Sequence, residues 1–121
     1  MTDFAAPIFN GTISAPAQSN DNMLYMILGR DASDSLERRA SAREPHLARL
    51  RTLADEGRLV LAGPLPAIDS EDPGPAGFEG SLVVAEFASL ETARQWAQAD
   101  PYIQSGAWTD AEVKPFRQVL P

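Results

Sequence analysis

The chain has no cysteine and only one histidine, His46, among its 121 residues. Without cysteine it can form no disulfide framework, no thiolate nucleophile and no cysteine-ligated metal site. A single histidine also argues against zinc, because catalytic zinc usually takes several histidine or carboxylate ligands. We therefore expect no metal ion in this protein.

Positive charge and long apolar runs are scarce as well. Ten Lys and Arg stand against 17 Asp and Glu, which gives a formal net charge of −7. Nucleic acids and anionic membrane surfaces attract basic patches, so we expect neither as a partner. No apolar run approaches the roughly 20 residues of a membrane helix, and the N-terminus lacks the regions of a signal peptide. The expected location is the cytoplasm.

What is present is the composition of one globular domain, with 44% apolar and 22% charged residues. Residues 1–22 differ from the rest, because Ala, Pro, Ser, Asn and Gly dominate them. They predict a flexible N-terminal extension, or alternatively an arm that docks on its own subunit or on a neighbour. The domain itself is expected at 23–121.

Apolar runs and helical spacings predict the order strand, helix, strand, strand, helix, strand. The strands are expected at 23–29, 59–62, 81–87 and 111–120. The main helix is predicted to begin at Pro45 and to end at Gly57, after a short helical turn at 35–39. The second helix is predicted to run from its N-cap Ser89 to Asp100, which precedes a proline.

This order is the βαββαβ pattern of a ferredoxin-like α+β domain, with an antiparallel sheet and both helices on one face. The first strand is predicted to be buried on both faces or nearly so, the second to be central and the last to lie at an edge or an interface. Residues 64–80, with four prolines and three glycines, predict a stiff lid or arm without regular structure. Nothing in the chain covers the other face of the sheet, so we expect a homodimer that packs sheet against sheet.

His46 precedes Leu50 by one helical turn and Leu53 by two, so the three side chains share the core-facing side, whereas Arg43, Arg49 and Arg51 are expected to face water. Asp100, at the end of the second helix, could lie beside the start of the first. A carboxylate that holds an imidazole fixes its tautomer, as a general base requires. The alternatives are a structural histidine with one hydrogen bond and a turn-forming aspartate.

Other residues carry weaker signals. The acidic loop residues Asp69, Glu71 and Asp72 are expected to be solvated rather than to bind a metal. Ser70 has no neighbouring base in the sequence, which does not favour a serine nucleophile. Four aromatic residues could line a cavity or belong to the core: Tyr25, Tyr102, Trp96 and Trp108.

From residue 23 to residue 120 the chain resembles the YciI-like family of the dimeric α+β-barrel superfamily. The resemblance rests on six stretches in this order: REPHLARL at 43–50, DEGRL at 55–59, AGPLPAIDS at 62–70, DPGPAGFEGS at 72–81, ADPY at 99–102 and VKPF at 113–116. It implies the same fold and dimer, and an active site centred on a histidine and an aspartate. These correspond to His46 and Asp100, with Asp69 as the rival aspartate, and Asp69, Ser70 and Tyr102 are candidate substrate-binding residues.

We therefore expect a small enzyme of lyase or isomerase type, in which His46 acts as general acid and base and Asp100 orients it. The expected substrate is a small organic molecule, held in a cleft between the sheet and the helices. Proton transfer of this kind requires no metal or organic cofactor. The alternative is a non-catalytic ligand-binding or sensory module with the same fold.

Overall fold

The computed structural model describes residues 22–121, so the predicted N-terminal extension lies outside the described residues except for Asn22. The elements in this part of the chain are β1 (Met23–Asp31), α1 (Leu36–Asp55), β2 (Leu59–Pro66), the 3₁₀ turn η2 (Gly74–Ala76), β3 (Phe78–Phe87), α2 (Leu90–Gln98), α3 (Pro101–Gln104) and β4 (Trp108–Phe116). Within residues 22–121, no helix is long and apolar enough to cross a membrane.

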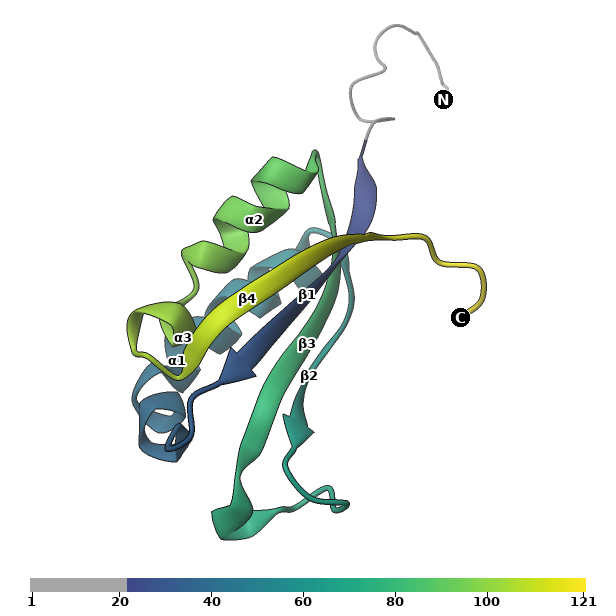
Figure 1. Cartoon of the computed structure of the whole chain (residues 1–121). Helices are drawn as coiled ribbons and strands as arrows, with labels where there is room; N and C mark the ends of the chain where they lie inside the picture. Colours follow the sequence, from purple (N-terminus) through teal and green to yellow (C-terminus); the bar gives the residue numbers. More distant parts are fainter. Residues whose placement is uncertain (1–21) are drawn as a thin grey trace, which may run out of the picture.

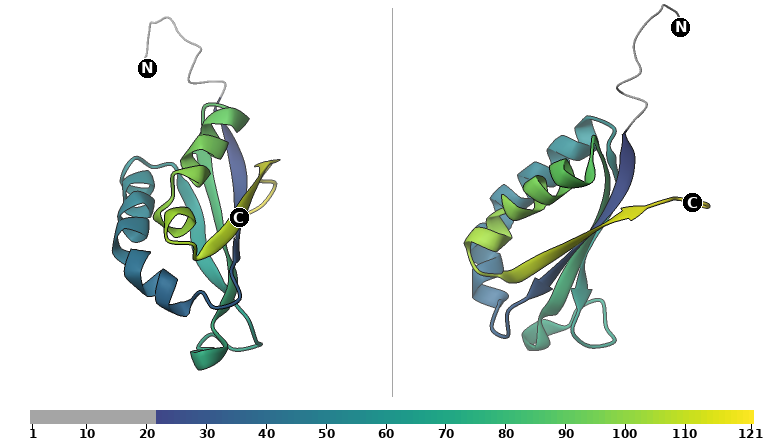
Figure 2. Two further views of the ribbon diagram at one scale, coloured as in Figure 1. Left: turned by 60° about the vertical axis from the view of Figure 1, so that its left-hand side comes forward. Right: turned by 45° about the horizontal axis from the view of Figure 1, so that its top comes forward.

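The four strands form one antiparallel sheet in the order β2-β3-β1-β4. Both long helices lie on the same face of this sheet, and α3 connects α2 to the start of β4 (Figures 1 and 2). This arrangement confirms the predicted ferredoxin-like α+β fold.

The core lies between the helices and the inner face of the sheet. Tyr25 and Ile27 of β1 are 5% and 0% exposed and belong to one apolar cluster with Leu50 and Leu53 of α1. Leu24, Met26 and Leu28 alternate with these residues, point to the opposite face and are only half-buried. The prediction that β1 is buried on both faces is therefore wrong for the single chain.

α1 is longer than predicted, because it begins at Leu36 and carries Pro45 in its interior. Its buried side chains recur at helical spacing along the whole length: Arg39, Ala42, His46, Leu50 and Leu53. Pro45 removes one hydrogen bond, that to the Ser41 carbonyl, but both residues are exposed, so water can bind the unpaired oxygen. Burial of the Arg39 and Ala42 side chains before the proline, and of His46 after it, keeps the helix continuous.

The end of α1 is as predicted. Gly57 has a φ of 75°, its N–H donates to Ala54 O at 3.0 Å, and the next N–H, from Arg58, donates to Leu53 O at 2.9 Å. These two bonds form a Schellman motif, in which glycine avoids the strain of a left-handed residue. The chain then turns directly into β2.

β2 differs from the prediction of a buried central strand at 59–62. It is an exposed edge strand that extends to Pro66, and β3 begins already at Phe78. An edge strand tolerates Pro64 and Pro66 because alternate N–H groups of an edge have no partner in the sheet. The predicted irregular segment is thus shortened to 67–77 and contains η2.

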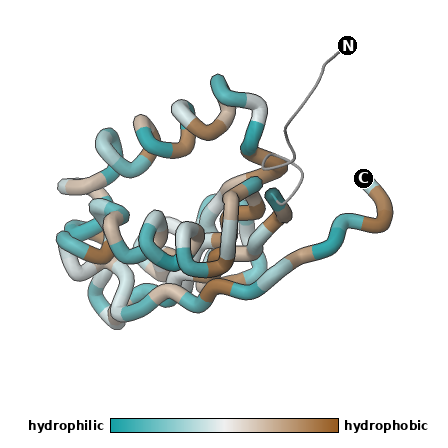
Figure 3. Tube along the Cα trace, turned by 90° about the horizontal axis from the view of Figure 1, so that it is seen from above, coloured by the Kyte–Doolittle hydropathy of each residue, from teal (hydrophilic) through white to brown (hydrophobic). Residues whose placement is uncertain are grey.

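The C-terminal third follows the predictions more closely. The Ser89 hydroxyl accepts the Thr92 N–H at 3.0 Å, as expected for the N-cap of α2. β4 is an edge strand, as predicted, but it begins at Trp108 and ends at Phe116. The chain beyond β4 extends away from the helices, and its last residues are hydrophobic (Figure 3).

Two glycines bring β1, β3 and β4 into close contact near the end of β1. A Cβ on Gly29 would stand 2.3 Å from the Trp108 ring, and a Cβ on Gly80 would stand 2.4 Å from the Gly29 carbonyl oxygen. Side chains at these positions would force the strands apart. Trp108 is therefore buried in a second cluster, with Ala42, Tyr102 and Ala107.

Candidate active site

His46 lies on the buried side of α1 and is 5% exposed. It belongs to the same helical stripe as Leu50 and Leu53, as the spacing predicts. Its ring stacks on Tyr102, with centroids 4.0 Å apart, and meets the edge of Trp108 at 5.6 Å. Packing on both sides holds the imidazole in one orientation.

Asp100 is the N-cap of α3 and is fully buried. Its backbone is extended, at φ −67° and ψ 139°, as expected for a residue that precedes proline. Pro101 is suited to the first helical position, and the Asp100 Oδ1 atom accepts the Tyr102 N–H at 2.9 Å. The short helix thus fixes the carboxylate relative to Tyr102.

The structure brings His46 and Asp100 together: Nδ1 of the ring lies 2.8 Å from Oδ1 of the carboxylate. A carboxylate can only accept, so Nδ1 carries the proton in this bond. In neutral His46 the other nitrogen, Nε2, then bears the lone pair, and no described residue hydrogen-bonds to it. This tautomer is the one that a general base at Nε2 needs.

Arg49 is a further member of this group, although the sequence predicted that it faces water. Its guanidinium donates to Asp100 Oδ2 at 3.1 Å and to the Trp96 carbonyl at 2.8 Å. It also stacks over the Trp96 ring at 4.1 Å. Partial burial lowers the pKa of Arg49, and the adjacent Asp100 carboxylate opposes this change. The sequence offered one signal for this position: Arg49 follows His46 by three residues, so the two side chains are neighbours on the helix surface.

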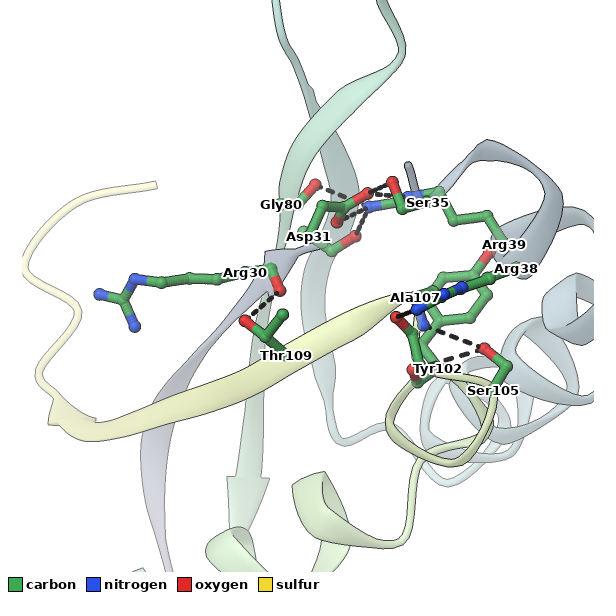
Figure 4. A network of polar contacts seen from close by, with 12 residues as sticks. Arg30, Asp31, Ser35, Arg38, Arg39, Gly80, Tyr102, Ser105, Ala107 and Thr109 are labelled. Carbon is green, nitrogen blue, oxygen red and sulfur yellow. Dashed lines mark hydrogen bonds and ion pairs between the residues drawn. The ribbon is translucent and has the colours of Figure 1, made fainter. Parts of the chain in front are cut away.

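Arg39 forms a second buried ion pair, with Asp31 at the end of β1 (Figure 4). The pair is bidentate, with N–O distances of 2.6 and 2.7 Å, and Ser35 donates to the same carboxylate. Arg39 also donates to the Gly80 carbonyl and to Ser81 Oγ, each at 2.9 Å. This network ties α1 to β1 and β3 beside the site.

A pocket of about 200 Å³ opens next to His46, between α1 and the β2–β3 edge of the sheet. Its polar lining comes from Arg39, Arg43, His46, Ser81 and Tyr102. Its apolar walls are Leu47, Leu50, Ala62, Gly63, Pro64 and Val83. Burial raises the pKa of the Tyr102 phenol above its ordinary value, and the charges of Arg39 and Arg43 oppose this rise.

The remaining predicted residues lie elsewhere. Asp69 and Ser70 are exposed in the segment after β2 and do not line this pocket. The Ser70 hydroxyl hydrogen-bonds only within its own loop, to the backbone of Asp72. Their contact with substrate therefore stays a prediction. Among residues 22–121, no group of three or more His, Asp and Glu could hold a metal ion.

Comparison with known proteins identifies the family of this chain. Residues 23–117 match the family model of the YCII-related domain. Protein YciI of Escherichia coli is 60% identical over 98 residues, which are 81% of this chain and 100% of that protein. An uncharacterized protein of Haemophilus influenzae is 50% identical over the same shares. This chain therefore belongs to the YciI-like family of YCII-related domains.

One solved structure has a similar fold. It is 5-chloro-2-hydroxyhydroquinone dehydrochlorinase (TftG) from Burkholderia phenoliruptrix, in complex with 2,5-dihydroxybenzoquinone. The TM-score is 0.69 at 23% identity, and the match covers 79% of this chain and 95% of that one. At this identity the likeness shows the fold alone.

Proposed function

We propose that this protein is a cofactor-independent lyase or isomerase that moves a proton on a small cyclic organic substrate. The observation that carries the proposal is the 2.8 Å contact between His46 and the buried Asp100 at the wall of the pocket. A solvated histidine needs no such partner, whereas a general base gains a fixed tautomer and orientation from it.

In the proposed reaction, Nε2 of His46 takes a proton from the substrate in the pocket. The electron pair of the broken bond to hydrogen forms a new double bond. In an elimination, the leaving group departs as an anion with its own bonding pair; in an isomerisation, the imidazolium returns the proton to another atom. Asp100 stabilises the imidazolium, and Arg49 balances the charge of Asp100.

The structural neighbour supports the choice of reaction class and substrate size. It acts on a chlorinated hydroxyhydroquinone and is called a dehydrochlorinase, which is an eliminating enzyme. The pocket beside His46 has room for one such ring, since a cavity of roughly 150 Å³ is known to hold benzene.

The test is chloride release from 5-chloro-2-hydroxyhydroquinone, compared between wild type and His46→Gln. We expect the variant to lose about 10²- to 10⁴-fold in turnover, the usual contribution of a general base. Ala62→Trp serves as a second variant, because Ala62 is exposed and a large ring there would close the pocket without leaving a cavity in the core. Equal turnover in all three proteins would contradict the proposal. Binding without turnover in wild type would favour the ligand-binding module instead.

We also infer that the protein acts as a homodimer, through the sheet face opposite the helices. This face presents apolar side chains between its charges. Val60, Leu61 and Phe116 are 42%, 48% and 40% exposed, and they border an apolar hollow of about 390 Å³ that reaches Leu120. A large uncovered apolar surface favours association with a second copy.

Light scattering at micromolar concentration tests this inference. We expect twice the monomer mass for wild type and the monomer mass for Leu61→Asp. Ile68→Asp is the matched control, because Ile68 is equally exposed, at 53%, but lies in the loop after β2. A monomeric wild-type protein would contradict the inference.

A further inference from the structure

The pocket beside His46 is cationic, although the chain as a whole carries a formal charge of −7. Two of its lining residues are arginines, and none of the described residues that line it is an aspartate or a glutamate. The pocket therefore has the opposite sign of charge to the molecule as a whole, which favours a binding role for these arginines.

The two arginines differ in their partners. Arg39 is 8% exposed, and its charge is matched by the bidentate contact with Asp31. Arg43 follows one helical turn later on the pocket side of α1 and is exposed. Within residues 22–121 it makes no ion pair and no side-chain hydrogen bond. It thus offers an uncompensated guanidinium at the mouth of the pocket.

Arg43 acts on the interior of the pocket and not only on solvent. Its charge opposes the rise in the pKa of Tyr102 that burial causes, so it lies close enough to influence the phenol. Tyr102 in turn stacks on His46 at 4.0 Å. A planar ring bound in the pocket would therefore lie near the imidazole of His46 and near the charge of Arg43.

We propose that the substrate is an anionic ring compound, a phenolate, enolate or hydroxyquinone oxyanion, and that Arg43 is the residue that selects it by pairing with the oxyanion. The inference rests on the proposed function, because it names the substrate class of the same pocket. Arg43 anchors the negative oxygen at the rim, and the apolar walls formed by Leu47, Leu50 and Val83 accept the ring. Guanidinium suits this role, since it stays charged at every accessible pH and donates along its plane.

The test is calorimetric binding of two rings of the same size. One is 2,5-dihydroxybenzoquinone, whose acidic hydroxyls are ionised at neutral pH, and the other is 2,5-dimethylbenzoquinone, which has no ionisable group. We expect wild type to prefer the anion, and Arg43→Gln to weaken its binding about tenfold or more without changing the affinity for the neutral ring. Arg43→Lys should recover part of this loss.

Arg51→Gln is the matched control. Arg51 lies on the same helix, is 63% exposed and pairs only with Glu44, at 3.7 Å. The Arg51→Gln variant should bind both rings as wild type does. It has the same net charge as Arg43→Gln, so the comparison separates the local contact of Arg43 from an effect of net charge. An equal loss in both variants, no preference for the anion in wild type, or no binding of either ring at millimolar concentration would contradict the inference.

The results also separate this inference from the proposed function. Chloride release that depends on His46, together with unchanged anion binding in Arg43→Gln, would support the proposed lyase function and refute the role of Arg43. Selective loss of anion binding in Arg43→Gln, without turnover of the chlorinated ring by wild type, would support the anion site and refute the lyase.

Discussion

Two buried carboxylates bind partners that both contact Tyr102, and these partners differ in one respect. Asp31 binds Arg39 at 2.6 Å and accepts the Ser35 hydroxyl. Asp100 binds Arg49 at 3.1 Å and the His46 ring at 2.8 Å. Both side chains are almost completely buried, at 1% and 0% exposure.

The difference lies in whether a partner has a basic atom that can take up a proton. The guanidinium of Arg39 has none, so the Asp31 centre is a fixed ion pair that fastens α1 to the sheet. The His46 ring has a second nitrogen, Nε2, so the Asp100 centre includes a group that can accept and return a proton. The comparison indicates that Asp31 contributes to stability and Asp100 to proton transfer.

Asp100→Asn should break the proton-transfer centre with the largest effect on activity. An amide can present its NH₂ group to Nδ1 and so favour the tautomer with the proton on Nε2, which removes the lone pair from the pocket. We expect turnover of the chlorinated ring to fall about 10²- to 10⁴-fold. Kinetic assays measure the loss, and ¹⁵N NMR of the only histidine reports the tautomer without any substrate.

Stability should fall only modestly in the same variant. With the NH₂ group turned to His46, the amide oxygen takes the place of Oδ2 and still accepts from Arg49, whereas the N-cap bond from the Tyr102 N–H is lost, which costs about 1 kcal/mol. Turnover within twofold of wild type would show that Asp100 is a turn residue whose contact with His46 has no catalytic role.

Asp31→Asn should show the opposite pattern. Removal of one member of a buried ion pair leaves Arg39 uncompensated, which costs about 3–5 kcal/mol of unfolding free energy. Urea unfolding measures this loss, and turnover per folded molecule should stay within a few fold. Glu44→Gln is the control, because the pair of Glu44 with Arg51 is exposed and such pairs contribute about 0–1 kcal/mol. A similar small loss in both variants would refute the structural role of Asp31.

The orientation of His46 could be predicted from sequence, whereas its surroundings could be predicted only in part. The spacing to Leu50 and Leu53 places the ring on the buried side of α1, and the structure agrees. Two helix ends on one face of a sheet made a contact with Asp100 possible. No spacing encodes the distance between residues 54 positions apart, so the contact itself required the structure.

The buried ion pairs of Arg39 and Arg49 were not predicted from the sequence, for a physical reason. Pattern analysis assigns arginine to solvent, since burial of its charge is costly unless a partner is present. Arg39 and Arg49 both have such partners, but Asp31 and Asp100 lie on other elements of the chain. The position of β2 was mispredicted for a similar reason, because an apolar run alone does not distinguish an edge strand from an interior strand.

Tyr102 contacts both Arg39 and His46, and its titration should give the smallest of the expected effects. Burial raises the pKa of the phenol in the folded protein, Asp100 adds to the rise, and Arg39 and Arg43 oppose it. From about pH 10, the pKa of an ordinary tyrosine, the unfolded chain loses this proton while the folded protein keeps it, so stability falls until the folded pKa is reached. Urea midpoints between pH 9 and about pH 11 should therefore fall more steeply in wild type than in Tyr102→Phe. Parallel curves would show that the Tyr102 hydroxyl is as solvated as in the unfolded chain.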